Sequence, residues 1–144
     1  MSLRVVIDTN VVFEGLTRKG GACGLVIDAW RAGLFSACIS NALAYEYDDV
    51  LSRKFSEHRW NETKPLLAEL VGDHAEFVRI WFSWRPSSSD PGDDHVIDCA
   101  MNSRAMVVTS NMRDFKQAVR TLGLKVMTPV KFLEHLTNRG YCDE

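Results

Sequence analysis

Residues 3–10, Leu3-Arg4-Val5-Val6-Ile7-Asp8-Thr9-Asn10, form an apolar run that ends in a polar triplet. A short and nearly continuous apolar run is typical of a strand that is buried on both faces of a parallel sheet. Ligands of such sheets bind beyond the carboxyl ends of the strands. We therefore expect the polar triplet to lie where a binding or catalytic site would form.

The rest of the chain alternates predicted helices and strands. Apolar runs indicate strands, and apolar residues that recur every three or four positions indicate helices. Residues 79–84 fit a strand or a helix end equally well, and the Pro- and Ser-rich residues 86–92 are typical of a loop. Elsewhere the pattern predicts strands at 35–39, 105–109 and 124–127, helices at 22–32, 41–51, 61–72, 93–103 and 129–136, and a short helix around Phe115.

Three features define the ends of the predicted helices. Ser40 or Asn41 can cap the helix that follows the second strand. Pro65 is tolerated only in the first turn of a helix, which favours a helix that begins at Asn61. Gly72 is expected to break this segment in two.

Length, composition and element order together predict the fold class. The chain has 144 residues, 46% of them hydrophobic and 25% charged, and a formal charge of −2, which is typical of one globular domain. Alternating helices and strands predict an α/β domain with three layers and a central, mostly parallel sheet. We expect a single domain over residues 1–144.

Composition also limits the location and the cofactors. No apolar run approaches the roughly 18 residues that span a bilayer, and the chain leads from Met1 straight into a strand, so we expect a cytoplasmic protein. The four cysteines lie far apart and outside any zinc-ligand spacing, which indicates reduced thiols. A pI near 6.1 argues against coating nucleic acid by bulk charge and leaves local basic patches open.

Two acidic residues stand where acids are unusual. Asp8 follows the first strand directly, although, taken by itself, a helix N-cap or an Asx turn explains it better than a functional site. Glu46 lies within or beside an apolar helical stripe that includes Leu43 and Val50. It is either a site residue or a boundary residue that reaches water or pairs with a basic side chain.

A second acidic group precedes the helix at 93–103. Asp90, Asp93 and Asp94 are more acids than helix capping needs. Asp94 lies three residues before Ile97, which turns it toward the apolar face, and Asp98 lies one turn further along. If Asp8, Glu46, Asp94 and the turn at residues 111–114 converge, they form an oxygen-rich pocket that selects Mg²⁺ or Mn²⁺.

The chain resembles the PIN domain family, the small nuclease domain of many prokaryotic toxin–antitoxin pairs. The resemblance covers nearly the whole chain, and its motifs come in the order of that family. It rests on Val5-Val6-Ile7-Asp8-Thr9-Asn10-Val11, Ile39-Ser40 with Glu46, Asp90-Pro91-Gly92-Asp93-Asp94, Val107-Val108-Thr109-Ser110-Asn111 with Asp114-Phe115, and Thr128-Pro129 with Phe132-Leu133.

This resemblance implies a three-layer PIN-like fold and a metal-dependent endoribonuclease of the toxin type. Carried over by position, Asp8, Glu46 and Asp94 would hold Mg²⁺ or Mn²⁺. Asn111 stands where the family often has Asp, so a second metal would depend on Asp114, Asp93 or Asp98. The remaining carried-over residues would orient ligands or water: Thr9, Asn10, Ser40 and Thr109. The implied partners are an RNA substrate, a protein antitoxin and a second copy of the chain.

Basic residues near these motifs are candidates for binding phosphates. Arg18 and Lys19 follow the first motif, and Arg113 and Lys116 accompany the last. The basic and aromatic residues at 53–55 and 58–60 are interpreted as a solvated helix end rather than as an RNA-stacking surface.

Other functions fit less well. An aspartyl-phosphate enzyme needs a suitably placed second Asp or Lys, and this chain has neither. A phosphate-binding loop needs a Lys, which is missing after Gly20-Gly21-Ala22-Cys23-Gly24. Neither a dinucleotide-binding motif nor the motif of a serine or cysteine hydrolase is present. One alternative stays open: a catalytically weak module that binds RNA or an antitoxin, because Asn111 replaces an acid.

Overall fold

The computed structural model describes residues 3–83 and 91–142. Its centre is a five-stranded sheet in the order β3-β2-β1-β4-β5, in which every pairing is parallel. The strands are β1 (Arg4–Ile7), β2 (Ser36–Ile39), β3 (Ala75–Phe77), β4 (Met106–Val108) and β5 (Val126–Met127). Strand order reverses between β1 and β4, and such a switch point is where the crevice of an open α/β sheet forms.

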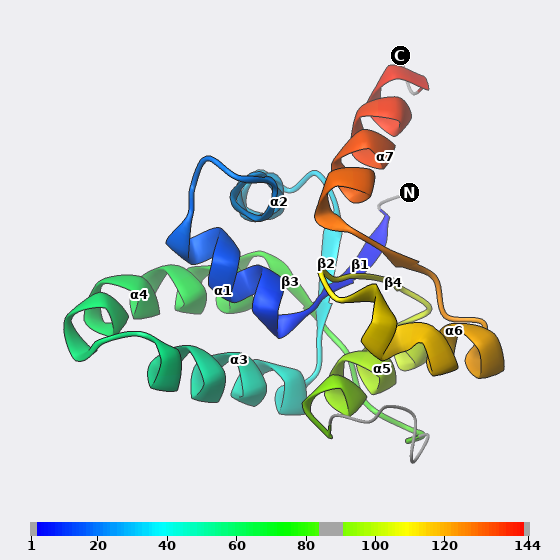
Figure 1. The fold of residues 1–144 in the computed structure, drawn as a ribbon, viewed down its shortest axis with the longest axis horizontal. Helices are drawn as coiled ribbons and strands as arrows, with labels where there is room; N and C mark the ends of the chain where they lie inside the picture. Colours follow the sequence, from blue (N-terminus) through cyan, green and yellow to red (C-terminus); the bar gives the residue numbers. More distant parts are fainter. Residues whose placement is uncertain (1–2, 84–90, 143–144) are drawn as a thin grey trace.

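Helices cover both faces of this sheet, so the fold is the predicted α/β fold with a central parallel sheet (Figure 1). On one side α2 packs against α1 and α7, and on the other α5 packs across β1, β2 and β4. The helices are α1 (Thr9–Thr17), α2 (Ala22–Arg31), α3 (Asn41–Lys54), α4 (Glu57–Asp73), α5 (Pro91–Ser103), α6 (Lys116–Leu122) and α7 (Pro129–Cys142), with a 3-10 helix η1 (Met112–Phe115).

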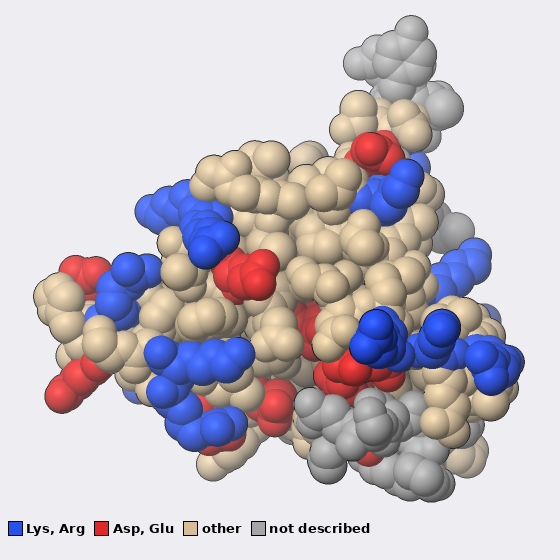
Figure 2. Space-filling model, in the orientation of Figure 1, with Lys and Arg blue, Asp and Glu red and all other residues tan. Residues whose placement is uncertain are grey.

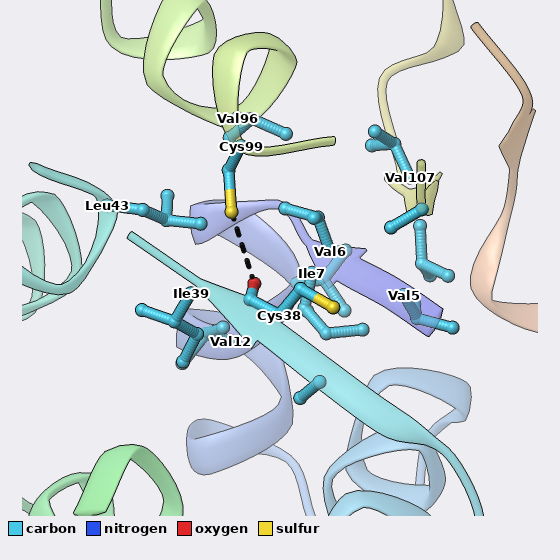
Figure 3. Packing of buried hydrophobic residues seen from close by; sticks show 14 of the residues in the cluster. Val5, Val6, Ile7, Val12, Cys38, Ile39, Leu43, Val96, Cys99 and Val107 are labelled. Carbon is cyan, nitrogen blue, oxygen red and sulfur yellow. Dashed lines mark hydrogen bonds between the residues drawn. The ribbon is translucent and has the colours of Figure 1, made fainter. Parts of the chain in front are cut away.

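The apolar strand residues form the core, as their continuous hydrophobicity predicts. Val5, Val6 and Ile7 are at most 1% exposed because helices cover both faces of the sheet (Figure 1), with α5 packed against β1. Figure 3 shows β1 with Cys38 and Ile39 of β2 and with side chains from α1, α3 and α5. Burial of this apolar surface is the main contribution to stability.

A close approach of two backbones fixes α1 against α2. A Cβ atom added to Gly24 would lie 2.4 Å from the carbonyl oxygen of Lys19 and 2.6 Å from that of Arg18. Only glycine fits there, so a side chain at this position would push the start of α2 away from the end of α1.

The long helix α4 differs from the prediction. It begins at Glu57 rather than Asn61, because the Ser56 hydroxyl caps it by accepting a hydrogen bond of 3.2 Å from the Arg59 amide. Pro65 therefore lies inside the helix and not in its first turn. Gly72 does not break the helix, which continues to Asp73.

The prediction for residues 79–84 is wrong over the part that the structure describes. The strand of this region is β3 at Ala75–Phe77, and residues 78–83 are neither strand nor helix. Their backbone is held by a side chain: Asn102 Oδ1 accepts hydrogen bonds from the amides of Trp81 (2.8 Å) and Phe82 (3.2 Å). Residue 84 and the loop residues 86–90, including Asp90, lie outside the described residues.

Among the other boundaries, the end of α2 before Gly33 and the cap of α3 by Ser40 are as predicted, whereas α7 is longer than predicted. The Gly33 backbone has φ +74° just after α2, and Ser40 rather than Asn41 caps α3. The last helix α7 extends to Cys142 rather than ending at residue 136. Among the residues that the structure describes, none of the helices has both the length and the apolar character needed to span a bilayer.

Candidate active site

Asp8 lies at the switch point of the sheet, directly after β1, and is only 3% exposed. By position it is the N-cap of α1, since its carbonyl oxygen accepts hydrogen bonds from the amides of Val11 (3.0 Å) and Val12 (3.2 Å). Its side chain, however, makes no capping hydrogen bond. The carboxylate of Asp8 is therefore not used to cap the helix.

Thr109 follows β4 and fixes this carboxylate. Its hydroxyl donates a hydrogen bond of 2.6 Å to Asp8 Oδ2 and accepts one of 3.0 Å from the Asn111 amide. The amide of Asp8 in turn donates to the carbonyl of Val108 at 2.9 Å. The ends of β1 and β4 are thus joined by both backbone and side chains.

Asn111 and Asp114 form the outer part of this hydrogen-bonded chain. Asn111 Nδ2 donates to Asp114 Oδ2 at 2.6 Å, and Asp114 lies in η1. An aspartate at 111 could not make this bond, since two carboxylates have no proton to share when both are ionised. The amide therefore removes one negative charge and holds the acid of η1 in place.

Three further acids lie on α5, which packs against β1. Asp93 (9% exposed), Asp94 (7%) and Asp98 (4%) are buried, and the first two occupy the first turn of the helix. Negative charge is favourable at a helix N-terminus. Asp94 is buried as its spacing from Ile97 predicts, and Asp98 lies one turn further along the same face.

Glu46 lies on α3 and is half-buried. The next residue, Tyr47, is fully buried, and its hydroxyl donates a hydrogen bond to the carbonyl of Ile7, the residue before Asp8. Burial raises the pKa of Tyr47 well above its usual value, so the hydroxyl keeps its proton. This bond anchors α3 to the end of β1.

Tyr47 was not recognised from the sequence as a site residue. Its position on the apolar stripe of α3 was the available signal, because a buried tyrosine hydroxyl needs a hydrogen-bond partner. The identity of that partner depends on the tertiary fold, and no spacing in the sequence indicates it.

The residues expected to orient ligands have varied surroundings. Thr9 (7% exposed) and Ser40 (2%) are buried, and the Ser40 hydroxyl accepts a hydrogen bond of 3.1 Å from the Leu43 amide as the cap of α3. Asn10 is exposed, and its Oδ1 accepts a hydrogen bond of 3.2 Å from Lys54 Nζ. Of the four, Thr109 contacts a candidate metal ligand directly.

The basic residues lie at two distances from Asp8. Arg113 and Lys116 are exposed in and beside η1, near the end of β4. Arg18 and Lys19 follow the far end of α1, and a nine-residue helix is about 13 Å long, so they do not adjoin the carboxylate. Figure 2 shows acidic side chains near the middle of this face, with basic side chains on both sides of them.

The donor set at this edge fits a hard divalent cation. Its buried acids offer oxygen ligands, and a buried carboxylate is stable only with donors or cations around it. Within the described ranges 3–83 and 91–142, no three Asp, Glu, His or Cys side chains form a ready set of metal ligands. Magnesium binds through one or two carboxylates and keeps several waters, so it does not need such a set.

The three described cysteine side chains, Cys23, Cys38 and Cys99, are free and buried, as predicted. None lies at a zinc-ligand spacing, and burial raises the pKa of Cys99 to about 12. These thiols are structural rather than nucleophilic.

The chain matches a family of known proteins. A family model described as PIN domain matches residues 4–113, which is more than half of the chain and includes Asp8, Glu46, Asp94 and Asn111. The chain belongs to the PIN domain family. PIN domains are generally nucleases and generally use divalent metal ions. A search of curated proteins finds no match.

Proposed function

We propose that this PIN domain protein is a metal-dependent endoribonuclease that hydrolyses phosphodiester bonds of RNA. The observation that carries the proposal is the buried Asp8 carboxylate at the switch point, which Thr109 fixes from the neighbouring strand at 2.6 Å. The side chain of Asp8 does not cap α1, and Asp8 directly follows β1, against which the acidic helix α5 packs. A costly buried acid without a capping role favours a functional site.

Asp8 and Asp94 would hold Mg²⁺ or Mn²⁺, with Glu46 as the third acid. A divalent cation at this site supplies activation of the attacking water and neutralises charge that develops on the phosphate. Other residues of the chain hold the metal ligands in position. Thr109 orients Asp8, and Tyr47 anchors the helix that carries Glu46 to the end of β1. Hydrogen bonds that neighbouring residues make to metal ligands hold the ligands rigidly.

The proposed reaction is an in-line attack of water on phosphorus, with departure of the ribose oxygen on the other side. No nucleophilic side chain of the protein takes part. Arg113 and Lys116, exposed beside η1, would attract the RNA backbone toward the acids. Arg18 and Lys19 would contact RNA further from the cleaved bond, because α1 separates them from Asp8.

A single metal ion is the simplest form of this site. Asn111 replaces a carboxylate, and its amide already donates to Asp114. A second metal would then depend on Asp114, Asp93 or Asp98, of which the last two are buried on α5. The weaker this second site is, the slower the cleavage that we expect.

The biological setting that we propose is a cytoplasmic toxin of a toxin–antitoxin pair, with the whole chain 1–144 as one domain. Exposed apolar side chains on the α2 and α7 side support a protein partner, either an antitoxin or a second copy in a homodimer. They are Leu25 (49% exposed), Leu34 (63%) and Val130 (55%).

A second candidate is a binding module that has lost most of its cleavage activity. The observation that favours it is again Asn111, whose hydrogen bond to Asp114 occupies the carboxylate that could replace the missing acid. Such a module would bind RNA or an antitoxin through the same edge.

Cleavage of labelled single-stranded RNA and tRNA with Mn²⁺, Mg²⁺ or EDTA tests the proposal. We expect cutting by the wild type only with metal, and a loss of about 100-fold or more in Asp8→Asn and Asp94→Asn. The matched control is Asp73→Asn, an exposed acid at the end of α4, which should cut like the wild type. Cutting by both site variants at the wild-type rate would refute the site, and RNA binding without cutting would favour the module.

A further inference from the structure

A cavity lies at the opposite edge of the sheet from the candidate active site. It has a volume of about 550 Å³ and is lined by residues at the start of β1, at the end of α5, before β5 and on α7. Arg4 is the first residue of β1, whereas Asp8 follows the last. The two sites are therefore separated by the length of the central strand.

The parallel register brings basic residues together at this amino edge. Val5 pairs with Met106, so Arg4 and Arg104 lie near the starts of adjacent strands. Val107 pairs with Val126, and the Val107 amide donates to the Lys125 carbonyl at 2.9 Å. Arg104 and Lys125 thus flank the start of β4, although 21 positions separate them in the sequence.

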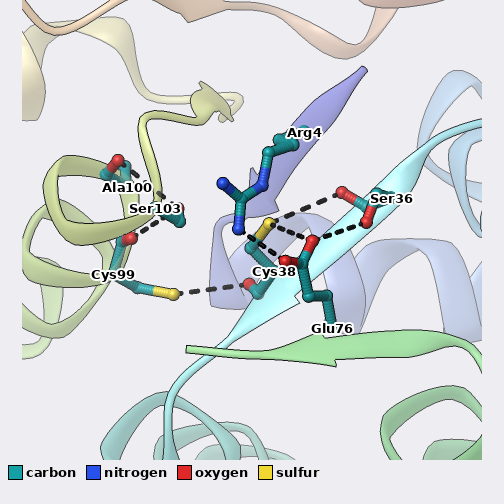
Figure 4. A network of polar contacts seen from close by, with 7 residues as sticks. All are labelled: Arg4, Ser36, Cys38, Glu76, Cys99, Ala100 and Ser103. Carbon is teal, nitrogen blue, oxygen red and sulfur yellow. Dashed lines mark hydrogen bonds and ion pairs between the residues drawn. The ribbon is translucent and has the colours of Figure 1, made fainter. Parts of the chain in front are cut away.

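The lining of the cavity is basic and apolar. Four basic residues line it, and none of its lining residues is acidic: Arg4, Arg104, Lys125 and Arg139. Arg4 is already paired, since its Nη2 lies 2.6 Å from Glu76 Oε1, as Figure 4 shows. Within residues 3–83 and 91–142, the structure gives Arg104 and Lys125 no ion pair, so two positive charges adjoin the cavity without a described counter-charge.

Arg104 has a backbone conformation that glycine would adopt more easily. Its φ is +57°, in the left-handed region, at the point where α5 ends and the Ala105 amide donates to the Ala100 carbonyl at 3.0 Å. A non-glycine residue in this region carries backbone strain. A positive charge near the C-terminus of α5 offsets part of that strain through the helix dipole.

We propose that this cavity binds a nucleoside phosphate monoester, either free or at the end of an RNA strand. A phosphate monoester carries a charge of about −1.5 to −2 at pH 7, which matches the two cations of Arg104 and Lys125. The apolar side chains of Met101, Leu122 and Leu124 also line the cavity and would pack against the nucleoside. The volume lies within the roughly 300–1,000 Å³ range of small-molecule sites.

This site is distinct from the proposed nuclease site and does not depend on it. Its ligand is bound by the side chains of Arg104 and Lys125 without a metal ion. Binding can therefore be measured in EDTA, where metal-dependent cleavage does not occur.

Calorimetric titration of the full chain in EDTA with AMP, adenosine and inorganic phosphate tests the proposal. Arg104→Gly removes the cation and suits the backbone at φ +57°, so it should fold at least as well as the wild type. Lys125→Gln is the second variant. The control is Lys64→Gln, an exposed lysine on α4 away from the cavity. Thermal unfolding checks that each variant is folded.

We expect AMP to bind the wild type and the control alike, and each site variant to bind about tenfold more weakly, as for the loss of one charge-assisted contact. Adenosine and inorganic phosphate should each bind more weakly than AMP, because each lacks one half of the ligand. Three results would each overturn the proposal. The wild type does not bind AMP, both site variants bind AMP as tightly as the wild type, or adenosine or phosphate alone binds as tightly as AMP.

Two short RNAs, one with a 5′-phosphate and one with a 5′-hydroxyl, distinguish the two sources of the ligand. Tighter binding of the phosphorylated RNA than of AMP, with the same dependence on Arg104, assigns the cavity to RNA ends. Binding of AMP alone assigns it to free nucleotides. Both results support the site, whereas equal binding of the two RNAs, unchanged in Arg104→Gly, would contradict the RNA assignment.

Discussion

The hydroxyl of Thr109 donates a hydrogen bond of 2.6 Å to Asp8 Oδ2, which joins two buried residues that lie 101 positions apart in the sequence. Each follows a central strand of the sheet, Asp8 after β1 and Thr109 after β4. The bond fixes the orientation of one carboxylate at the switch point. On this pair rests the proposal of a metal-dependent site.

Replacing Thr109 by valine tests what the hydrogen bond contributes. Valine has nearly the same shape but cannot donate to Asp8 or accept from the Asn111 amide. We expect cleavage to fall by about 10- to 100-fold, as for the loss of an outer contact to a metal ligand, and the free energy of unfolding to fall by about 1–2 kcal/mol. Thr109→Ser keeps the hydroxyl and should retain most activity, so equal rates in the valine and serine variants would contradict this role.

Metal ions should stabilise the fold through the buried acids. At a free Mn²⁺ concentration of about 100 times the Kd, binding to the native state adds about 2.7 kcal/mol to the free energy of unfolding. Thermal unfolding with Mn²⁺ and with EDTA measures this difference. Asp8→Asn should lose the difference while remaining as stable as the wild type in EDTA, because it removes a buried charge. An undiminished Mn²⁺ effect in Asp8→Asn would place the metal elsewhere.

Asn111→Asp should change metal affinity and stability in opposite directions. In EDTA it replaces the hydrogen bond to Asp114 by a repulsion between two carboxylates, which we expect to cost about 1 kcal/mol. With Mn²⁺ the added charge should tighten binding by about tenfold. Calorimetric titration and urea unfolding measure the two effects. An unchanged Mn²⁺ affinity would show that position 111 does not contribute to the metal site.

Alkaline pH should destabilise the protein partly through Cys99. Burial raises the pKa of this thiol from 9.0 to about 12, so the native state retains a proton that the unfolded chain loses. Its contribution to stability is therefore complete below about pH 9 and is lost as the pH rises toward 12, with a slope approaching about 1.4 kcal/mol per pH unit. Urea unfolding between pH 8 and about 10 should show a shallower decline in Cys99→Ala. Equal slopes would rule out Cys99 as a contributor.

The sequence predicts β1, β2, β4 and β5, but not β3, because these four strands are encoded locally. Val5, Val6 and Ile7 form an apolar run that is typical of a strand buried on both faces, and Val107 repeats the pattern. The cap of α3 by Ser40 follows from residue type and position in the same way. Such features depend on a few neighbouring residues, so they can be predicted without the tertiary fold.

Features that depend on distant side chains could not be predicted. The irregular backbone at Trp81 is held by Asn102, 21 residues away, and no local pattern indicates that bond. The start of α4 also differs from the prediction. Pro65 favours a helix that begins at Asn61, but the Ser56 cap places the start at Glu57.

In the candidate site, too, some features are encoded locally and others depend on residues that are distant in the sequence. The acids could be selected from the sequence because an acid beside an apolar run is costly, and Asp94 is buried as its spacing predicts. The contact between Thr109 and Asp8, and the anchoring of α3 by Tyr47, depend on which strands are neighbours. The separation of Arg18 from Asp8 follows from the direction of α1, which residue type does not encode.

The most direct test of the proposed metal site is an anomalous difference map from crystals of the protein soaked in Mn²⁺. We expect a peak at the carboxyl edge of the sheet, within about 2.0–2.4 Å of carboxylate oxygens of Asp8 and Asp94, and no such peak in crystals of Asp8→Asn. A peak bound to other residues, or a peak that persists in Asp8→Asn, would contradict it.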